Sequence, residues 1–186
     1  NFDGFHKGHQ AVVGRAIERA RAEGRPAVVA TFDPHPVRFF RPDTAPFRLT
    51  SLNQRERLFA QAGTDAMMVF PFNTGLTELS AKDFVAQKLT GVGGVVTGED
   101  FTFGKGRDGN VDVLADLGRA HGFIAEAVSP VFDGADVISS SRIRDALQAG
   151  DCVTAAQLLT RPFAIEGVVH HGDQNGLRAN IQHLLQ

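Results

Sequence analysis

The sequence predicts an α/β protein with a doubly wound, Rossmann-like and mostly parallel sheet. Apolar runs of strand length alternate with helical segments at least four times, at spacings too long for hairpins. Polar or glycine-rich stretches follow these runs, and open α/β sheets bind ligands beyond the carboxyl ends of their strands. The 186 residues suffice for one well-buried domain and a small second piece.

The first half of the chain is predicted to contain two helices and two strands. The helix over residues 9–23 has apolar side chains at helical spacing, and Gly24 suits the position after its end. Residues 26–33 and 65–72 are apolar runs of strand length. Between them, the Ser-x-x-Gln spacing of a capping box opens a helix over residues 51–62. A short apolar strand is also expected before the first residue, because the opening turn follows one.

The second half continues the alternation. Its predicted elements are a helix opened by Ser80, a strand over residues 92–97, a helix over 111–120, a strand over 123–128, and helices over 139–147 and 151–159. Serine and aspartate at the starts of these helices are preferred capping residues. The pair Arg161-Pro162 then breaks the pattern.

Residues 1–9 read NFDGFHKGH and place His6 and His9 at the start of the first helix. Gly4 and Gly8 allow the backbone to approach a ligand closely. A helix start offers free N–H groups and the positive end of the helix dipole. The stretch therefore predicts a phosphate site with imidazole donors beside it, although two surface histidines at a capped helix are the plainer alternative.

Residues 138–144 read ISSSRIR, so hydroxyl and guanidinium groups also open a later helix. A serine run is favoured at a helix start for capping alone. Two cationic, hydroxyl-rich helix starts in one chain, however, suggest a polyphosphate held from two sides.

Two loops complete the predicted crevice. Residues 31–36 read TFDPHP, and the two prolines are expected to exclude helix and strand from a loop that continues through Pro46. Residues 97–107 read TGEDFTFGKGR, which predicts a flexible basic loop or, alternatively, a solvated surface loop. All four stretches follow predicted strands or strand-like segments, so they can face one crevice.

Composition narrows the class of function. The net charge of −2 argues against a broad nucleic-acid surface, and no apolar run approaches the ~20 residues of a membrane span. The single cysteine, Cys152, fits a reducing cytoplasm and is expected to be a small buried residue on a helix. The phosphate-loop and dinucleotide glycine motifs are missing, as are paired-cysteine and zinc-helix patterns.

The four stretches, in this order and at these separations, resemble the FMN adenylyltransferase domain of the bacterial bifunctional riboflavin kinase/FAD synthetase family. The resemblance covers nearly the whole chain and implies an adenylyltransferase domain over residues 1–160. It implies that the FMN phosphate attacks the α-phosphorus of ATP, which gives FAD and pyrophosphate without a covalent enzyme intermediate. Catalysis then consists of positioning and of stabilising charge on the phosphates.

The resemblance also assigns roles to residues at matching positions. His6 and His9 would contact the ATP phosphates, and Arg144 with Ser140 and Ser141 would hold the β/γ end. Asp33 and Asp100 would line the nucleotide and flavin pocket, and Lys105 and Arg107 would screen the phosphates from a mobile loop. The phenylalanines expected either to flank the flavin ring or to anchor the loops are Phe39, Phe40, Phe101 and Phe103. Mg²⁺ is expected to arrive with ATP, held mainly by phosphate oxygens and water.

Residues 161–186 are interpreted as the incomplete start of the family's riboflavin kinase β-barrel. Residues 161–173 resemble its opening strand, with the adjacent His170 and His171 as structural residues. About twenty residues cannot close a barrel. The 186-residue chain is therefore expected to lack kinase activity, and its parent protein to have it.

Two other functions remain open. Another H-x-G-H nucleotidyltransferase would adenylate pantetheine phosphate or nicotinamide mononucleotide, or cytidylate an alcohol phosphate. The second alternative hypothesis is a non-catalytic module that binds a flavin or a nucleotide. The TFDPHP loop and the block over residues 97–107 favour FMN and ATP as small-molecule substrates.

Overall fold

A computed structural model describes residues 1–44 and 48–167. Pro46, the His170-His171 pair and the rest of the predicted barrel strand beyond residue 167 lie outside the described residues.

Four of the strands form two parallel pairs, which confirms the α/β class. β1 (Val28–Asp33) pairs with β2 (Ala66–Pro71), and β3 (Gly94–Gly98) pairs with β4 (Ile124–Val128). Within residues 1–44 and 48–167, no hydrogen-bonded ladder joins β1 to β3, so the sheet consists of two separate parallel halves. An antiparallel hairpin that the sequence did not predict adds β5 (Phe132–Asp133) and β6 (Asp136–Val137).

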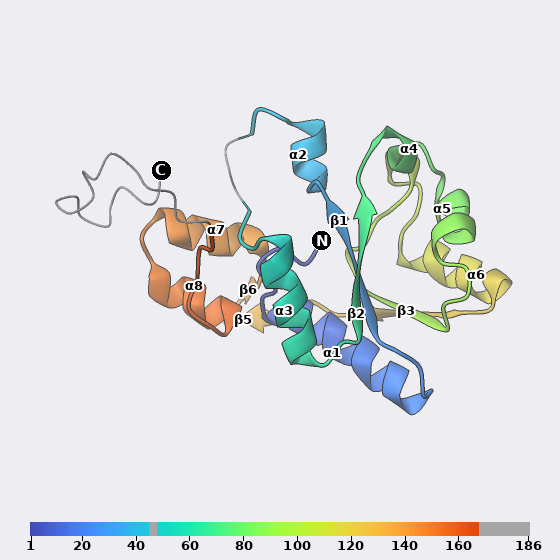
Figure 1. The fold of residues 1–186 in the computed structure, drawn as a ribbon, viewed down its shortest axis with the longest axis horizontal. Coiled ribbons are helices and arrows are strands. Elements are labelled where there is room, and N and C mark those ends of the chain that lie inside the picture. Colours follow the sequence, from blue (N-terminus) through green and yellow to red (C-terminus); the bar gives the residue numbers. More distant parts are fainter. Residues whose placement is uncertain (45–47, 168–186) are drawn as a thin grey trace.

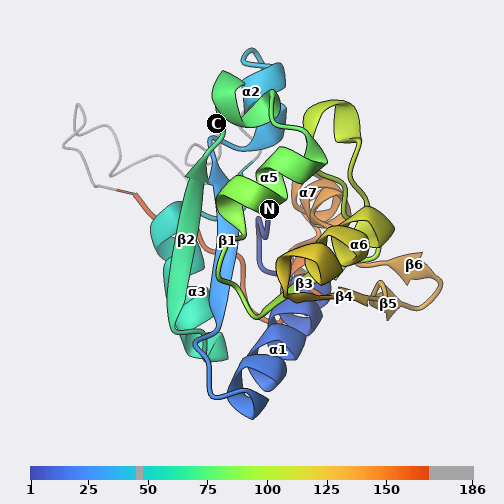
Figure 2. The ribbon, with the colours of Figure 1, turned by 90° about the vertical axis from the view of Figure 1, so that its right-hand side faces the viewer.

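The helices surround the two parallel pairs (Figures 1 and 2). The longer ones are α1 (Lys7–Ala22), α3 (Leu52–Ala62), α5 (Ala81–Lys88), α6 (Val111–His121), α7 (Ser140–Gln148) and α8 (Cys152–Leu159). In Figure 1, α3, α7 and α8 lie to the left of β1 and β2, and α4 (Thr74–Thr77), α5 and α6 lie to the right. α1 passes below, contacts β3 and shares a hydrophobic cluster with β1, so it packs against both halves of the sheet.

Capping residues explain why the predicted helices begin where they do. Ser51 and Gln54 form the predicted capping box of α3, while Ser80 and Asp151 cap α5 and α8 through their side chains. α1 begins earlier than predicted because His6 itself is the N-cap.

One loop prediction was wrong in part. Helix α2 (Pro36–Phe40) lies inside the segment from which prolines were expected to exclude a helix. Its proline occupies the first turn, where the missing N–H costs no helical hydrogen bond. The basic loop contains a short 3₁₀ turn, η1 (Lys105–Arg107), whose residues are exposed, as the alternative of a solvated surface loop predicts, and the Lys105 backbone N–H anchors it to Leu79 O.

Cys152 was predicted to be buried, and the structure shows it exposed. It occupies the first position of α8, directly after the cap Asp151, where the side chain faces outward. Ala155, Leu158 and Leu159 form the buried face of this helix instead.

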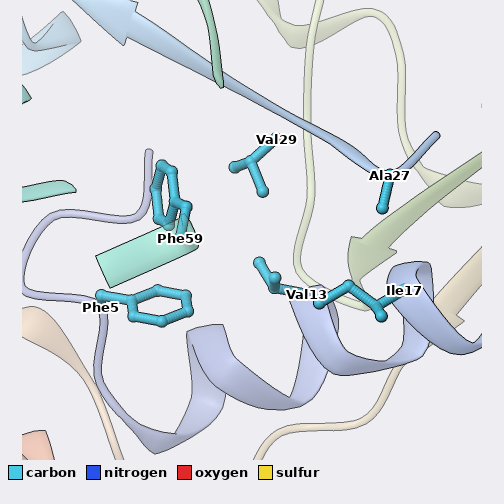
Figure 3. Close-up of a cluster of buried hydrophobic side chains, with 6 residues drawn as sticks. All are labelled: Phe5, Val13, Ile17, Ala27, Val29 and Phe59. Atoms are coloured by element: carbon cyan, nitrogen blue, oxygen red, sulfur yellow. The ribbon is translucent and has the colours of Figure 1, made fainter. Parts of the chain in front are cut away.

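One hydrophobic cluster supports the N-terminal turn. Phe59 of α3 is 1% exposed and meets Phe5 edge to face, with ring centroids 5.0 Å apart. Figure 3 shows both rings beside Val13 of α1 and Val29 of β1. α1, β1 and α3 therefore share one core directly beneath the H-x-G-H turn.

No helix of the described part of the chain is both long and apolar enough to cross a membrane.

Replacing Phe59 by alanine is expected to lower the free energy of unfolding by about 3–5 kcal/mol, because it removes a buried ring and leaves a cavity. Urea denaturation measures this loss. The control is Phe132→Ala, whose ring is 57% exposed and whose loss should stay within about 0.5 kcal/mol. Equal losses in the two variants would contradict this account of the core.

Candidate active site

The turn that precedes α1 has an unusual backbone. Phe2, Gly4 and Phe5 all have positive φ angles, of 56°, 83° and 44°. A Cβ atom at Gly4 would lie 2.8 Å from Leu49 Cδ1, so glycine is required there both for the conformation and for the close contact. Positive φ at the two phenylalanines persists only where the surrounding structure holds it.

The two histidines of the H-x-G-H motif form a stacked pair. Their ring centroids are 3.7 Å apart with an interplanar angle of 20°. His6 Nδ1 accepts the backbone N–H of His9 at 3.4 Å, so a neutral His6 carries its proton on Nε2 and can donate it to a ligand. A Cβ at Gly8 would lie 3.2 Å from the His6 ring, so a larger residue there would push the ring away from its stacked position.

Burial keeps both imidazoles uncharged at neutral pH. Desolvation, followed by nearby positive charge, lowers the pKa of His6 to about 4. Desolvation and the neighbouring His6 lower the pKa of His9 well below its ordinary value. His9 Nδ1 is buried and has no hydrogen-bond partner within the described part of the chain. The pair is therefore a neutral donor site rather than a cationic one.

The start of α7 lies directly against this turn. Ser139 caps the helix, and Ser140 Oγ donates a hydrogen bond to Asp3 O at 2.8 Å. Arg144 Nη2 lies 2.7 Å from Asp3 Oδ2. The structure thus brings Ser140 and Arg144 to the H-x-G-H turn, as the sequence predicted. Ser141 is exposed in the first turn of α7.

The contacts of Asp3 with Ser140 and Arg144 form a junction between the turn and α7. Asp3 was not predicted from the sequence as a site residue. Its carboxylate accepts hydrogen bonds from the backbone N–H groups of Leu49 and Thr50 and from the Thr50 hydroxyl, at 3.0–3.1 Å. Gly4 N donates in turn to Thr50 Oγ1 at 3.0 Å. The only sequence signal was its place in the NFDG stretch, which was interpreted through its glycine.

Arg161 holds the other side of the turn and was also missed. Its Nη2 donates to Gly4 O at 2.7 Å, and its Nη1 donates to Leu159 O at 3.1 Å. Gln10 Nε2 donates to Phe5 O at 3.0 Å. No motif signals these contacts, because they join residues up to 157 positions apart.

The TFDPHP segment reaches the same region through its polar side chains. Asp33 forms an ion pair with Arg48 at 2.6 Å, and Arg48 directly precedes Leu49. His35 caps α2 by accepting the Val37 N–H at Nδ1, at 3.1 Å. Desolvation lowers the pKa of His35 to about 4, against the opposing effect of the Asp3 charge.

The glycine-rich loop is anchored elsewhere. Lys105 pairs with Glu78, and its backbone N–H donates to Leu79 O at 2.7 Å. Asp108 accepts the N–H of Ala81 at the start of α5, at 3.1 Å. These contacts place the predicted ligands Lys105 and Arg107 at α4 and α5, and not in hydrogen-bond contact with the histidine turn. The Asp100 carboxylate lies close to Gly98, where a Cβ would be 2.8 Å from Oδ1.

A row of phenylalanine rings joins the two loops. Neighbouring ring centroids lie 5.2–6.2 Å apart, and Phe101 stacks on Phe103 at 5.4 Å with an angle of 12°. This phenylalanine row consists of Phe40, Phe39, Phe72, Phe32, Phe70, Phe84, Phe103 and Phe101. It connects the predicted flavin-contacting residues of α2 with those of the glycine-rich loop.

The donor set fits a phosphate better than a metal ion bound directly. Neutral imidazoles, hydroxyls, a guanidinium and the N-termini of α1 and α7 all offer hydrogen-bond donors. The Asp3 carboxylate already accepts from Leu49, Thr50 and Arg144. Among residues 1–44 and 48–167, no group of three His, Cys, Asp or Glu side chains could hold a metal ion.

Comparison with known proteins gives one family. Residues 1–142 match the family model described as FAD synthetase. The bifunctional riboflavin kinase/FMN adenylyltransferase of Pseudomonas fluorescens is 43% identical over 178 residues, which are 94% of this chain and 57% of that protein. The proteins of the same name from Escherichia coli K12 and Bacillus subtilis are 36% and 39% identical, over 95% and 94% of this chain and 57% and 56% of their own lengths.

This chain thus spans little more than half the length of the curated relatives it matches. A solved structure titled macrolide-efflux protein from Streptococcus pneumoniae is similar, with a TM-score of 0.76 and 30% sequence identity. The match covers 87% of this chain and 62% of that one.

The lowered histidine pKa values predict that stability falls on acidification. The unfolded chain binds a proton on His6 near pH 6.5 and the folded protein only near pH 4, so the free energy of unfolding should decrease as the pH is lowered through this window. His6→Asn should flatten the decrease, since asparagine still caps a helix. Urea denaturation at several pH values measures this, with the exposed His121→Asn as the matched control. If the free energy of unfolding changed with pH equally in the unsubstituted chain and in His6→Asn, the lowered pKa of His6 would be refuted as the cause.

Proposed function

Because this chain belongs to the FAD synthetase family, we propose that it transfers AMP from ATP to the phosphate of FMN, forming FAD and releasing pyrophosphate. The observation that carries the proposal is the junction at Asp3. It places the H-x-G-H turn next to Ser140 and Arg144. Two helix N-termini with neutral and cationic donors therefore converge where a polyphosphate would be bound.

In the proposed reaction, an oxygen of the FMN phosphate forms a bond to the α-phosphorus of ATP. The bond between the α-phosphorus and the bridging oxygen breaks, and the electron pair leaves with pyrophosphate. The Nε2–H of His6 and the free N–H groups of α1 would stabilise the charge at the α-phosphate. Arg144 and Ser140 would hold the β- and γ-phosphates, so that the leaving group stays aligned with the attacking oxygen.

The two loops would bind the rest of the substrates. Asp33 is the last residue of β1 and Asp100 follows β3, so both lie at the carboxyl ends of strands, where such folds bind nucleotides. Phe40, which is 65% exposed at one end of the phenylalanine row, offers a face for the flavin ring. Lys105 would have to leave Glu78 before it could screen a phosphate.

Mg²⁺ would enter as the complex with ATP. It would be held by phosphate oxygens and water, which suits a site made of hydrogen-bond donors. Its contribution would be to neutralise charge on the phosphates, while the residues of this chain orient them.

For the whole protein we propose a second activity, riboflavin phosphorylation, because the relatives named above carry both activities in their names. The family match covers residues 1–142, so this chain alone is expected to use FMN and leave riboflavin unchanged. A single cysteine and ATP as substrate favour the cytoplasm as the site of the reaction.

Incubation with FMN and Mg·ATP is expected to yield FAD and pyrophosphate, detected by chromatography. His9→Ala should slow turnover by about 10²–10³, because it removes one side of the charge-stabilising pair, while FMN binding persists. The exposed His121→Ala is the control.

Other outcomes discriminate between the candidate functions. Turnover of pantetheine phosphate or nicotinamide mononucleotide in place of FMN would assign a different adenylyltransferase. Binding of FMN and ATP without product, in a folded parent chain, would identify a non-catalytic module.

Phe40→Ala is expected to raise KM for FMN without changing KM for ATP, since the ring would contact only the flavin. Phe132→Ala removes a similarly exposed ring outside the phenylalanine row and should change neither constant. Steady-state kinetics with each substrate varied in turn tests this. A higher KM for ATP, or no change in KM for FMN, would place the flavin elsewhere.

A further inference from the structure

Asp3 is a buried charge whose partners come from two other segments of the chain. Its side chain is 2% exposed. The carboxylate accepts hydrogen bonds from Leu49 and Thr50, which lead into α3, and from Arg144 of α7. Burying a carboxylate is costly unless hydrogen bonds and an opposite charge compensate it, and here both are present. Asp3 therefore has a fixed position relative to both segments.

The contact with Arg144 restricts the direction of the guanidinium as well as its distance. A guanidinium is planar and presents its N–H groups in a rigid fork. When Nη2 is held at 2.7 Å by Asp3 Oδ2, the plane of the fork and the direction of its other N–H groups are constrained. The Arg144 side chain is 20% exposed, so the protein surrounds most of it and leaves part of it accessible.

The backbone of the same residue fixes the second donor. Asp3 O accepts the Ser140 hydroxyl at 2.8 Å, and Asp3 lies three residues before His6 in the same turn. One residue thus sets the position of the α7 donors relative to the histidine pair, through its carbonyl for Ser140 and through its carboxylate for Arg144.

We propose that Asp3 is a positioning residue for the adenylyl transfer, and that its carboxylate orients the Arg144 guanidinium toward the β- and γ-phosphates of ATP. The proposal rests on the proposed function. Asp3 does not touch the reacting atoms. Its effect reaches the reaction through Arg144, so its loss should affect ATP and pyrophosphate rather than FMN.

The chain offers a matched comparison on the same helix. Arg142 of α7 pairs with Asp133 at 2.8 Å, but their side chains are 29% and 43% exposed, and Asp133 belongs to the β5–β6 hairpin. Removing Asp133 also leaves an α7 arginine without its carboxylate. It does so outside the junction with the histidine turn.

The first test is the kinetics of Asp3→Asn and Asp133→Asn in FAD synthesis. Loss of a residue that orients a metal ligand typically costs about 10–100-fold, and we take the same range for a residue that orients a phosphate-binding arginine. We expect kcat/KM for ATP to fall by about this factor in Asp3→Asn, with KM for FMN unchanged, and Asp133→Asn to match the parent chain. Equal kcat/KM for ATP in both variants, or a fall confined to FMN, would overturn the proposal.

A double-mutant cycle separates orientation of Arg144 from a general structural role. If Asp3 acts through Arg144, the variant Asp3→Asn/Arg144→Gln should be no slower than Arg144→Gln alone. Losses that multiply would show that Asp3 acts independently of Arg144. The double variant removes both charges, so it leaves no lone buried ion and remains usable if Asp3→Asn alone does not fold.

Failure of this inference is distinguishable from failure of the proposed function. A parent chain that makes no FAD refutes the function. A parent chain that makes FAD while Asp3→Asn does so equally well refutes only the role of Asp3. Circular dichroism and FMN binding of each variant confirm that the comparison is made between folded proteins.

Discussion

The carboxylate of Asp3 is a buried negative charge, and the geometry of the candidate site follows from how that charge is compensated. Its donors lie 46, 47 and 141 positions away along the chain. The turn, the segment that opens α3, and α7 can satisfy it only when all three are packed together. Site assembly is therefore coupled to folding: an unsatisfied Asp3 would cost more than most surface contacts contribute.

The groups around the histidine pair provide positive electrostatic potential from fixed positions. The imidazoles are neutral because burial lowers their pKa values. Arg55 is 1% exposed beneath them and donates to Asn1 O and Thr31 Oγ1. With the N-termini of α1 and α7, these groups form fixed dipoles and charges that need little reorganisation when a phosphate binds. Such preorganisation suits a reaction in which the protein makes no covalent bond.

The helix starts could be predicted because they depend on interactions between residues that are close in the sequence. Ser51, Ser80 and Asp151 cap helices because each bonds the N–H three residues on, a relation contained in a few neighbouring residues. The failures have local causes too: Pro36 starts a helix, and Cys152 lies at an outward-facing first position. The partners of Asp3 and Arg161 lie beyond the reach of local reasoning, because they depend on how α7 and α8 pack. The sequence also did not predict that the phenylalanine row is continuous, although four of its members were expected to flank the flavin or anchor the loops.

The phenylalanine row has an optical consequence. The chain contains 15 phenylalanines and neither tryptophan nor tyrosine. Phenylalanine is much harder to oxidise than those two residues, whose rings quench flavin emission by electron donation to the excited isoalloxazine. A flavin seated against this row would meet no such electron donor in the chain and would retain its fluorescence. The protein itself absorbs weakly in the near ultraviolet, so the absorbance and emission of a bound flavin would be observed with little background from the chain.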